Sequence, residues 1–398
     1  MNIIIIGAGA SGLIAGIEAA RNGASVTILE KSEKIGKKIL ASGNGRCNLT
    51  NINQGEEFYR GENSAFAWGI INKFNHFDAM RYFTDMGIYT KNKNDYIYPF
   101  SEQASSVVEV LLMEAEHLNI KIKTREEVIS ICKVAKSFEV KTRTWDYRSD
   151  KVIVATGSPA SLGIKISEDD YHLVADTGHE LIKPLPALVA LDGVGDYFTK
   201  WAGVRMEGAA TLLVDEELII TTRGELQFTD YGISGIPTFS LSRFAVKAID
   251  EDKQAIVVLD LMPDFDEEFL AGMLSERLHN CPYKSLQESL IGLLPKKMIA
   301  ILTSKAKSLE ELAVWIKTFP ILITGAHSLE QAQVCSGGIS TAQLNSETLE
   351  SLKMPGLYFT GEVVDVDGDC GGYNLQWAWS SGVVAARSAI IGSKCFSD

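Results

Sequence analysis

The first thirty residues have the pattern of a strand, a glycine turn, a helix and a second strand. Ile3–Ile6 is an unbroken apolar run, which is typical of a parallel strand buried on both faces. Gly7, Gly9 and Gly12 follow in GxGxxG spacing. The first glycine permits a tight turn, the second lets the backbone approach a pyrophosphate, and the third lets the helix pack on the strand. The pattern predicts an α/β, Rossmann-like domain that binds a dinucleotide.

Glu30 ends the second predicted strand, Ser25–Leu29, and it lies 18 residues after the third glycine. An acid at this place accepts hydrogen bonds from a ribose hydroxyl and disfavours a 2′-phosphate. The predicted ligand is therefore FAD or NAD rather than NADP. The first turn of the helix, with Ala10 and Ser11, would present free amide groups to the phosphates.

Two later stretches favour FAD over NAD. "KVIVATGS" (Lys151–Ser158) is an apolar strand that runs into Ala-Thr-Gly, and it resembles a segment that many flavoproteins place beside FAD. "GLYFTGEVV" gives a strand ending in Gly361 and Glu362, which resembles the motif that holds a flavin's ribityl chain. A helix beginning near Asn374 would stabilise the negative charge of a reduced flavin, or would merely complete the sheet. The C-terminus thus returns to the first domain, and the middle of the chain is an insertion.

The polar stretch "KKILASGNGRCNLTN" (Lys37–Asn51) follows the first unit. It is open to four interpretations: a metal loop, a redox cysteine site, a phosphate cradle or a surface linker. We favour a cradle, because small residues let the backbone lie against a cofactor. Cys47 has no second cysteine nearby, so we expect packing against the flavin rather than a catalytic thiol. Arg46 would neutralise pyrophosphate charge or pair with a neighbouring acid, and we favour the pyrophosphate.

The middle of the chain changes character twice. Residues 121–151 alternate in short strands, which is typical of a β-meander crossover, and strands separated by turns resume after Pro186. Residues 264–318 have helical patterns, with Asp264 and Ser308 as expected N-caps. We expect an FAD-binding domain of residues 1–188 and 335–398, an inserted β-barrel-like domain of residues 189–263 and 319–334, and a helical subdomain of residues 264–318. "GISG" within the insertion predicts a tight turn, either a wall of the substrate site or a structural turn.

Composition limits the partners. The formal net charge of −13, without a basic block, argues against nucleic acid and anionic membranes. No apolar run approaches the roughly 18 residues of a membrane span. The six cysteines have neither CxxC nor metal-type spacing, so we expect no metal and reduced thiols in a cytoplasmic protein. The sequence does not indicate an oligomeric state.

These motifs together resemble the BaiN/YhiN-type bacterial flavoproteins, which are described as NAD(P)/FAD-dependent oxidoreductases. The resemblance rests on GxGxxG with Glu30, "KKILASGNGRCN", "VIVATG", "GELQFTDYGISGIP", "CSGGIS" and "GLYFTGEVVDVDGDCGGYNLQWAWSSG". It implies an FAD domain built from both chain ends, a β-barrel-like domain and a helical cap. The implied activities are reduction of bile-acid enones and oxidation of aminoacetone. Ser158, Ile236 and Cys335 depart from the family's usual residues.

The main prediction is an FAD-dependent oxidoreductase that takes hydride from NAD(P)H at flavin N5 and reduces a small hydrophobic enone or carbonyl compound. The alternatives are an oxidase of a small amine or amino ketone that uses O2, and a non-enzymatic redox sensor. Tyr373 and His327 are the candidates for a catalytic role. The predicted FAD contacts are Gly7, Gly9, Ala10, Ser11, Gly12, Glu30, Lys31, Lys38, Gly43, Asn44, Gly45, Arg46, Cys47, Asn48, Val128, Ala155, Thr156, Gly157, Gly361, Glu362, Gly372, Tyr373, Asn374 and Leu375.

Overall fold

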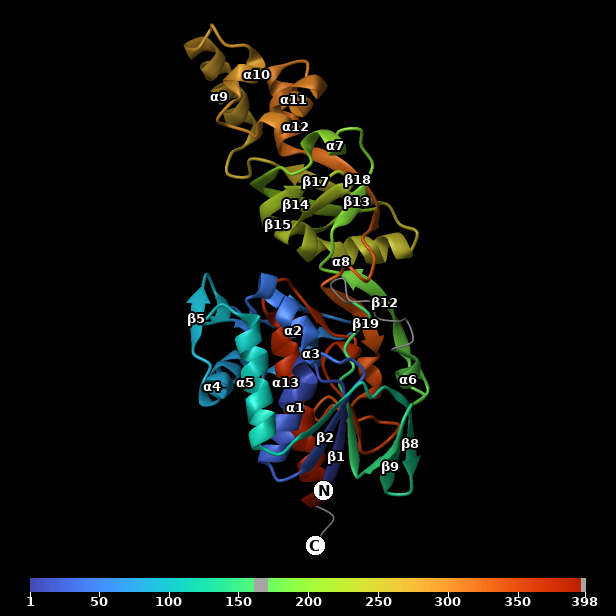
Figure 1. Cartoon of the computed structure of the whole chain (residues 1–398). Coiled ribbons are helices and arrows are strands. Elements are labelled where there is room, and N and C mark those ends of the chain that lie inside the picture. Colours follow the sequence, from blue (N-terminus) through green and yellow to red (C-terminus); the bar gives the residue numbers. More distant parts are fainter. Residues whose placement is uncertain (161–170, 395–398) are drawn as a thin grey trace. The chain divides into compact units, whose positions relative to one another are not determined.

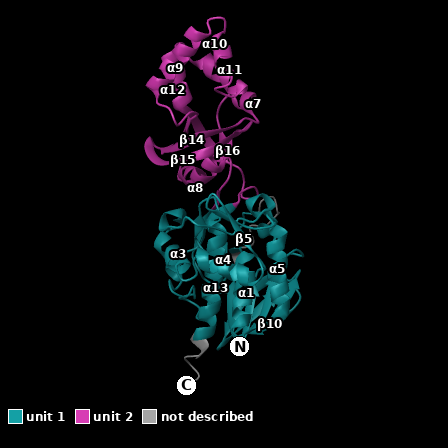
Figure 2. Cartoon of the chain, turned by 90° about the vertical axis from the view of Figure 1, so that its left-hand side faces the viewer, with its two compact units in different colours: residues 1–184, 334–398 teal, residues 185–333 magenta. Residues whose placement is uncertain are grey.

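The computed structural model of the chain describes residues 1–160 and 171–394 (Figure 1). By contacts between Cα atoms the chain divides into two compact units (Figure 2). The first unit comprises Met1–Pro184 and Val334–Asp398, and the second comprises Leu185–Gln333. Both ends of the chain therefore belong to the same unit.

A parallel five-stranded sheet forms the centre of the first unit, with the strand order β20-β11-β1-β2-β7. Its strands are β20 (Leu357–Phe359), β11 (Lys151–Val154), β1 (Asn2–Ile6), β2 (Ser25–Glu30) and β7 (Lys121–Thr124). All four isoleucines of β1 are buried, because the strand has neighbours on both edges and cover on both faces. The C-terminal strand β20 pairs with β11, so the last part of the chain completes the sheet.

Three long helices lie side by side in this unit: α1 (Ala10–Arg21), α5 (Ala104–His117) and α13 (Tyr373–Lys394) (Figure 1). Their close approach depends on small residues. A Cβ added at Gly382 of α13 would lie 2.6 Å from the Ser11 carbonyl oxygen of α1. The shorter helices are α2 (Lys37–Ala41), η1 (Ser42–Gly45), η2 (Glu56–Phe58), α3 (Ser64–Ile71), α4 (His76–Asp85), α6 (His172–Ala175), η4 (Thr341–Gln343) and η5 (Gly361–Val363).

Smaller sheets accompany the parallel sheet of the first unit, and one of their strands, β12, continues past the boundary at Leu185 into the second unit. The predicted meander crossover is confirmed as an antiparallel sheet of three strands in the order β10-β9-β8. A second three-stranded sheet has the order β3-β6-β5, and two-stranded pairs join β21 with β4 and β12 with β19. The strands are β3 (Thr50–Asn51), β4 (Tyr59–Arg60), β5 (Thr90–Lys93), β6 (Tyr96–Pro99), β8 (Val128–Val134), β9 (Ser137–Thr142), β10 (Asp146–Ser149), β12 (Leu181–Ala187), β19 (Val334–Ile339) and β21 (Asp367–Gly368).

The second unit is built on a closed antiparallel barrel in the order β13-β16-β15-β14-β17-β18. Trp201 is fully buried in its core, where it packs against Phe228 and Phe319. The strands are β13 (Leu191–Gly193), β14 (Arg205–Val214), β15 (Glu217–Phe228), β16 (Gly232–Gly235), β17 (Ala255–Asp260) and β18 (Phe319–Ala326). The helices are α7 (Phe198–Trp201), α8 (Ile236–Asp250), α9 (Glu267–Asn280), α10 (Leu286–Ser289), α11 (Lys296–Lys305) and α12 (Leu309–Lys317). The predicted fold class is confirmed.

Two local predictions are wrong. The N-cap of α9 is Asp266 rather than Asp264, since the Asp266 side chain accepts from the Phe269 amide at 2.7 Å while Asp264 pairs with Arg223. "GISG" is not a turn between strands but the barrel strand β16, because its backbone pairs with both β13 and β15. The expected N-cap Ser308 is confirmed at the start of α12.

None of the helices in the described part of the chain has the length and apolar character that crossing a bilayer requires.

Candidate functional site

The three glycines of the first turn have different surroundings. A Cβ at Gly7, where φ is +104°, would lie 2.3 Å from the Ala155 carbonyl oxygen, and one at Gly12 would lie 2.0 Å from the Gly7 carbonyl oxygen. A Cβ at Gly9, the N-cap of α1, would meet no described atom within 4 Å. Packing therefore requires glycine at the first and third positions. At the second position, glycine leaves open space in front of the helix N-terminus, where an anion is favoured.

Several buried polar side-chain atoms of the first unit, including the hydroxyls of Tyr82 and Ser149, have no hydrogen-bond partner among the described residues. Four of these atoms come from the segments predicted to hold the dinucleotide, and they are the hydroxyls of Ser11, Thr156 and Thr360 and the Oδ1 atom of Asn48. Thr156 and Thr360 come just after β11 and β20, so they lie at the same carboxyl edge of the parallel sheet as the glycine turn. Buried polar groups are nearly always paired, and an unpaired one costs about 1–3 kcal/mol. A polar ligand at this edge would supply the missing partners, so these residues fit a bound dinucleotide.

Glu30 is held rigidly at the end of β2. Its Oε2 accepts from the Ala8 amide at 2.7 Å and its Oε1 accepts from the Ser32 amide at 2.8 Å. The Glu30 carbonyl oxygen accepts from the Glu126 amide at 2.9 Å, which brings the start of β8, with Val128, beside the acid. Each carboxylate oxygen has a second lone pair, so Glu30 can still accept from a ribose hydroxyl.

The polar stretch Lys37–Asn51, which we call the polar loop, turns sharply after α2. Gly43, Asn44, Gly45 and Cys47 all have left-handed backbone angles, with φ between 55° and 80°. Glycine adopts this region without strain, and asparagine tolerates it better than most residues. A Cβ at Gly45 would meet no described atom within 4 Å. The small residues thus form a compact turn that has open space beside it.

Three cysteines of the first unit are poor nucleophiles, whereas Cys132 of β8 is exposed. Cys47 is fully buried, and its burial raises the pKa of the thiol to about 12. Burial also raises the pKa of Cys335 to about 12 and that of Cys370 to about 11. Because the thiolate is the reactive form, these thiols are inert at neutral pH. This favours the packing role for Cys47.

The Glu362 side chain contacts residues from several segments of the first unit. Its carboxylate forms an ion pair with Lys38 of α2 and accepts a hydrogen bond from the Ser158 hydroxyl at 3.0 Å. The buried Cys335 thiol of β19 interacts with both Glu362 and Ser158. Ser158 and Cys335, the two departures from the family pattern in the first unit, therefore lie around the predicted ribityl-binding acid.

Arg46 pairs with a neighbouring acid, which is one of the two roles predicted for it. Its Nη1 lies 3.8 Å from Glu102 Oε2, and its Nε donates to the Gly43 carbonyl oxygen at 3.3 Å. The role of Arg46 toward a pyrophosphate stays a prediction. In the described part of the chain, His, Cys, Asp and Glu side chains form no group of three or more that could hold a metal ion.

The C-terminal glycine turn is tightly braced. The Tyr373 hydroxyl donates to the Asn53 carbonyl oxygen at 2.9 Å, and its ring stacks on Phe58 with centroids 4.7 Å apart. Burial raises the pKa of this phenol well above its ordinary value. These contacts favour stacking over proton donation. Asn374 accepts from the Gly368 amide at 2.8 Å and donates to the Gly368 carbonyl oxygen at 2.7 Å, which fixes the start of α13.

A buried polar network, which the sequence did not reveal, ties α13 to the loop. Gln376 accepts from the Thr50 hydroxyl at 2.7 Å and donates to the Phe74 carbonyl oxygen at 3.1 Å. Trp379 donates to the Leu49 carbonyl oxygen at 2.9 Å, and Trp377 donates to that of Gly361 at 3.0 Å. Only the polar type of Gln376 within an otherwise apolar, small-residue helix hinted at this network.

His327 belongs to the second unit. Its Nε2 lies 3.4 Å from Asp192 Oδ1, and its ring lies 4.1 Å from the Tyr231 ring, centroid to centroid. Tyr373, the other candidate, belongs to the first unit. His327 thus has an acid to orient it, but its catalytic role stays a prediction.

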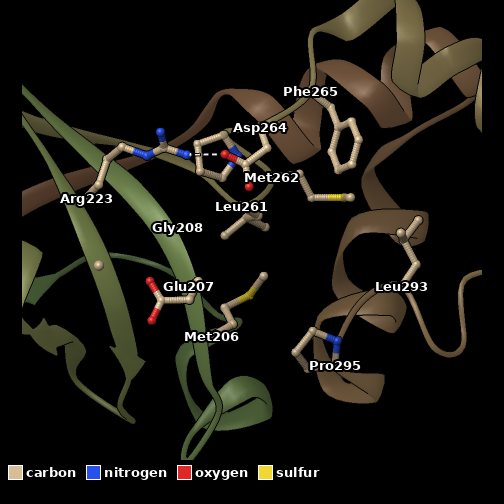
Figure 3. A pocket seen from close by; sticks show the side chains of 12 residues that line it. Met206, Glu207, Gly208, Arg223, Leu261, Met262, Asp264, Phe265, Leu293 and Pro295 are labelled. Atoms are coloured by element: carbon tan, nitrogen blue, oxygen red, sulfur yellow. Dashed lines mark hydrogen bonds and ion pairs between the residues drawn. The ribbon is translucent and has the colours of Figure 1, made fainter.

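The second unit also contains a cavity of about 490 Å³ (Figure 3). Barrel residues such as Met206 and Glu207 lie on one side, and Leu293 and Pro295 lie on the helical side. The remaining lining residues are Gly208, Arg223, Gly224, Leu261, Met262, Pro263, Asp264 and Phe265. Arg223 and Asp264 form an ion pair at 2.7 Å, so their charges neutralise each other.

Comparison with known proteins identifies the family. The HI0933-like protein Rossmann domain family matches residues 1–388. The chain belongs to the HI0933-like family. A relative in Clostridium scindens, 3-dehydro-bile acid delta(4,6)-reductase, is 40% identical over 400 residues, which cover 97% of this chain and 98% of the relative. The predicted family is confirmed, and so is the predicted class of FAD-dependent oxidoreductase.

More distant relatives of this chain have another name. The ribosomal RNA dihydrouridine synthase of Escherichia coli is 30% identical over 402 residues, which cover 97% of each chain. The Haemophilus influenzae protein of the same name is 29% identical over 403 residues, again 97% of each chain.

Proposed function

We propose that this protein uses FAD and NAD(P)H to reduce a carbon–carbon double bond conjugated to a carbonyl group in a small hydrophobic molecule. The observation that carries the proposal is the set of unpaired buried polar atoms around the open glycine turn, which fits a dinucleotide. The reductase with 40% identity over nearly the whole chain supports the substrate class.

The names of the relatives point to one chemistry. A delta(4,6)-reductase acting on a 3-dehydro-bile acid saturates carbon–carbon double bonds of a ketone. A dihydrouridine synthase saturates the double bond of a uracil ring, which is also conjugated to a carbonyl. Both are reductions of a double bond conjugated to a carbonyl, in which a hydride would add to the end of the conjugated system remote from the carbonyl, a reaction that flavins support.

RNA is the second candidate substrate, and the Escherichia coli relative supports it. We favour the small molecule for two reasons. The bile-acid reductase has the higher identity, 40% against 30%. The net charge of −13 also opposes binding to a polyanion, since RNA affinity depends on neutralising phosphates.

Residues of the first unit would each bind a different part of FAD. The N-terminal amides of α1 would hold the pyrophosphate at the open space beside Gly9, and Glu30 would accept from the adenosine ribose. Glu362, oriented by Lys38 and Ser158, would accept from the ribityl hydroxyls. Bound FAD would accept hydride from NAD(P)H and deliver it to the substrate. We place this reaction in the cytoplasm, and the five described cysteines, all unpaired, agree with a reducing compartment.

Anaerobic mixing tests the proposal. NADH or NADPH should bleach the yellow absorption of the purified holoenzyme, and a 3-oxo steroid acid with double bonds at positions 4 and 6 should restore it. If neither nucleotide bleaches the flavin, the reductase proposal fails.

Two controls address the alternatives. Restoration by a uridine-containing ribosomal RNA fragment, but not by the steroid, would establish the RNA substrate. Peroxide formed with small amines or amino ketones under air would instead establish the oxidase.

A further inference from the structure

The β5–β6 hairpin presents a basic and aromatic face that the proposed function has not used. Register pairs Lys91 with Tyr98 and Lys93 with Tyr96 across the two strands. Ile97 and Pro99 are buried while Tyr96 and Tyr98 are half-buried, so both tyrosines lie on one face of β6. Cross-strand partners project to the same side of a sheet. Two lysines and two tyrosines therefore share one face, which we name the hairpin face.

Glu102, just after β6, forms ion pairs with three cationic side chains at this face. It forms an ion pair with Lys91, a second with Lys93 at 2.7 Å and a third with Arg46 at 3.8 Å. Hydrogen bonds from Lys91 and Lys93 lower the pKa of Glu102 to about 2, so it is ionised at neutral pH. Asp95, in the hairpin turn, is the other acid that acts on this face. Three cations against two carboxylates leave a positive site on a chain whose net charge is −13.

These cations are accessible to a solute. The side chains of Lys93 and Arg46 are 47% and 42% exposed, and that of Lys91 is 26% exposed. The Arg46 guanidinium lies 5.3 Å from the centre of the Tyr98 ring. Cations beside an aromatic surface suit a ligand that combines phosphates with a flat ring.

The hairpin face adjoins the predicted flavin cradle. A Cβ at Gly43 would lie 3.4 Å from Cε1 of Tyr98, and one at Gly371 would lie 2.7 Å from Cε1 of Tyr96. The two tyrosines thus contact both the polar loop and the C-terminal glycine turn. A nucleotide bound at this face would lie beside the cofactor site.

We propose that the hairpin face binds the phosphates of the reduced nicotinamide nucleotide, with Lys91, Lys93 and Arg46 as the anion site and a tyrosine ring as a stacking surface. The proposal rests on the proposed function, which requires this donor. The sequence contains a single GxGxxG fingerprint with its acid, and that fingerprint is assigned to FAD. The donor therefore needs another site, and the hairpin face has the matching charge and aromatic surface.

A purely structural role for these ion pairs predicts different behaviour. If Glu102 only fastens the hairpin, Glu102→Gln should loosen it and should not improve nucleotide binding. If the face binds phosphate, removing the competing carboxylate should improve binding, because the cations lose their internal partner. Substitutions of Glu102 and Lys93 should then act in opposite directions.

The first experiment measures anaerobic flavin reduction as a function of NADPH and NADH concentration. For Lys93→Ala we expect the half-saturating concentration to rise about fivefold, and for the Lys91→Ala/Lys93→Ala double variant at least about twentyfold, with the limiting rate and FAD content unchanged. For Glu102→Gln we expect it to fall about threefold. Lys136→Ala, at an exposed turn of the meander, is the matched control and should leave it unchanged.

The proposal would be overturned if the half-saturating nucleotide concentration changed neither in the lysine variants nor in Glu102→Gln. An effect of Lys93→Ala on the half-saturation by an acidic enone with none on that by the nucleotide would also overturn it, because the face would then bind the substrate's carboxylate.

The second experiment separates this proposal from the proposed function. Calorimetric titration of the holoenzyme with ADP involves no electron transfer, so it remains informative even if neither nucleotide bleaches the flavin. We expect Lys93→Ala to weaken ADP binding about fivefold and Glu102→Gln to strengthen it. Equal affinity for wild type and both variants, or no ADP binding by the wild type, would overturn the proposal.

Discussion

The glycine turn of the first unit and the cavity of the second unit differ in whether their polar side chains have partners. Around the glycine turn, the hydroxyls of Ser11, Thr156 and Thr360 are buried without partners. At the cavity, Arg223 and Asp264 already pair with each other. No buried unpaired side-chain atom falls in residues 185–333, a range that the structure describes throughout. The first region has buried polar atoms that a ligand could pair, whereas the ion pair of the second region is already formed.

The strongest test of this contrast fills the open space at the glycine turn. Gly9→Val should lower FAD affinity at least about a hundredfold, equivalent to about 2.7 kcal/mol, because its side chain would occupy the place of the pyrophosphate. The fold should survive, since a Cβ at Gly9 meets no described atom within 4 Å and φ is −83°. Flavin release on dilution measures the affinity, and circular dichroism monitors the fold.

A matched control is Gly272→Ala in α9 of the second unit, where a Cβ also meets nothing described within 4 Å. It should leave FAD affinity unchanged. Normal FAD binding by Gly9→Val would show that the space beside the helix is not the cofactor site.

Acid should weaken the first unit through His179. This residue is 5% exposed, and burial together with the nearby Lys353 lowers its pKa to about 4. Below pH 6.5 the unfolded chain binds a proton that the folded chain refuses, so stability falls as the pH drops toward 4. The loss should reach about 2 kcal/mol at pH 5. Urea unfolding at pH 7.5 and pH 5 measures it.

The same titration on His179→Gln isolates the effect, since glutamine has no charge to gain. His117→Gln, at an exposed position of the same unit, serves as the control and should retain the pH dependence of the wild type. If His179→Gln shows the wild-type pH dependence as well, the histidine is not responsible.

A smaller effect is expected at Thr360. Thr360→Val removes a buried hydroxyl that has no described partner, so the apoprotein should be at least as stable as wild type. FAD affinity should fall about fivefold, or about 1 kcal/mol, if the hydroxyl bonds to the cofactor. A variant that loses apoprotein stability and keeps its FAD affinity would contradict the contrast between the two regions.

The smallest effect is expected at the cavity. Asp264→Asn breaks an ion pair whose side chains are 57% and 78% exposed, so the free energy of unfolding should change by less than about 0.5 kcal/mol. FAD affinity should not change. A clear loss of flavin would show that the second unit contributes to cofactor binding.

Local sequence patterns were reliable where the chemistry is local. GxGxxG followed by Glu30 predicted β1, α1 and β2, because glycine spacing and an apolar run determine a strand–turn–helix without long-range contacts. The N-cap Ser308 was predicted for the same reason. The prediction of Asp264 as an N-cap was wrong, because two acids lie two residues apart: Asp264 pairs with Arg223 on a distant strand, and Asp266 caps the helix.

The sequence by itself determined the α/β class, the return of the C-terminus to the first sheet and the family. Only the tertiary structure decided which side chains meet: Ser158 and Lys38 at Glu362, Gln376 at Thr50, and three cations at Glu102. The physical reason is the range of the interactions. Turn geometry and hydrophobic periodicity depend on neighbours in the chain, whereas ion pairs and buried hydrogen bonds join residues that only the folded backbone brings together.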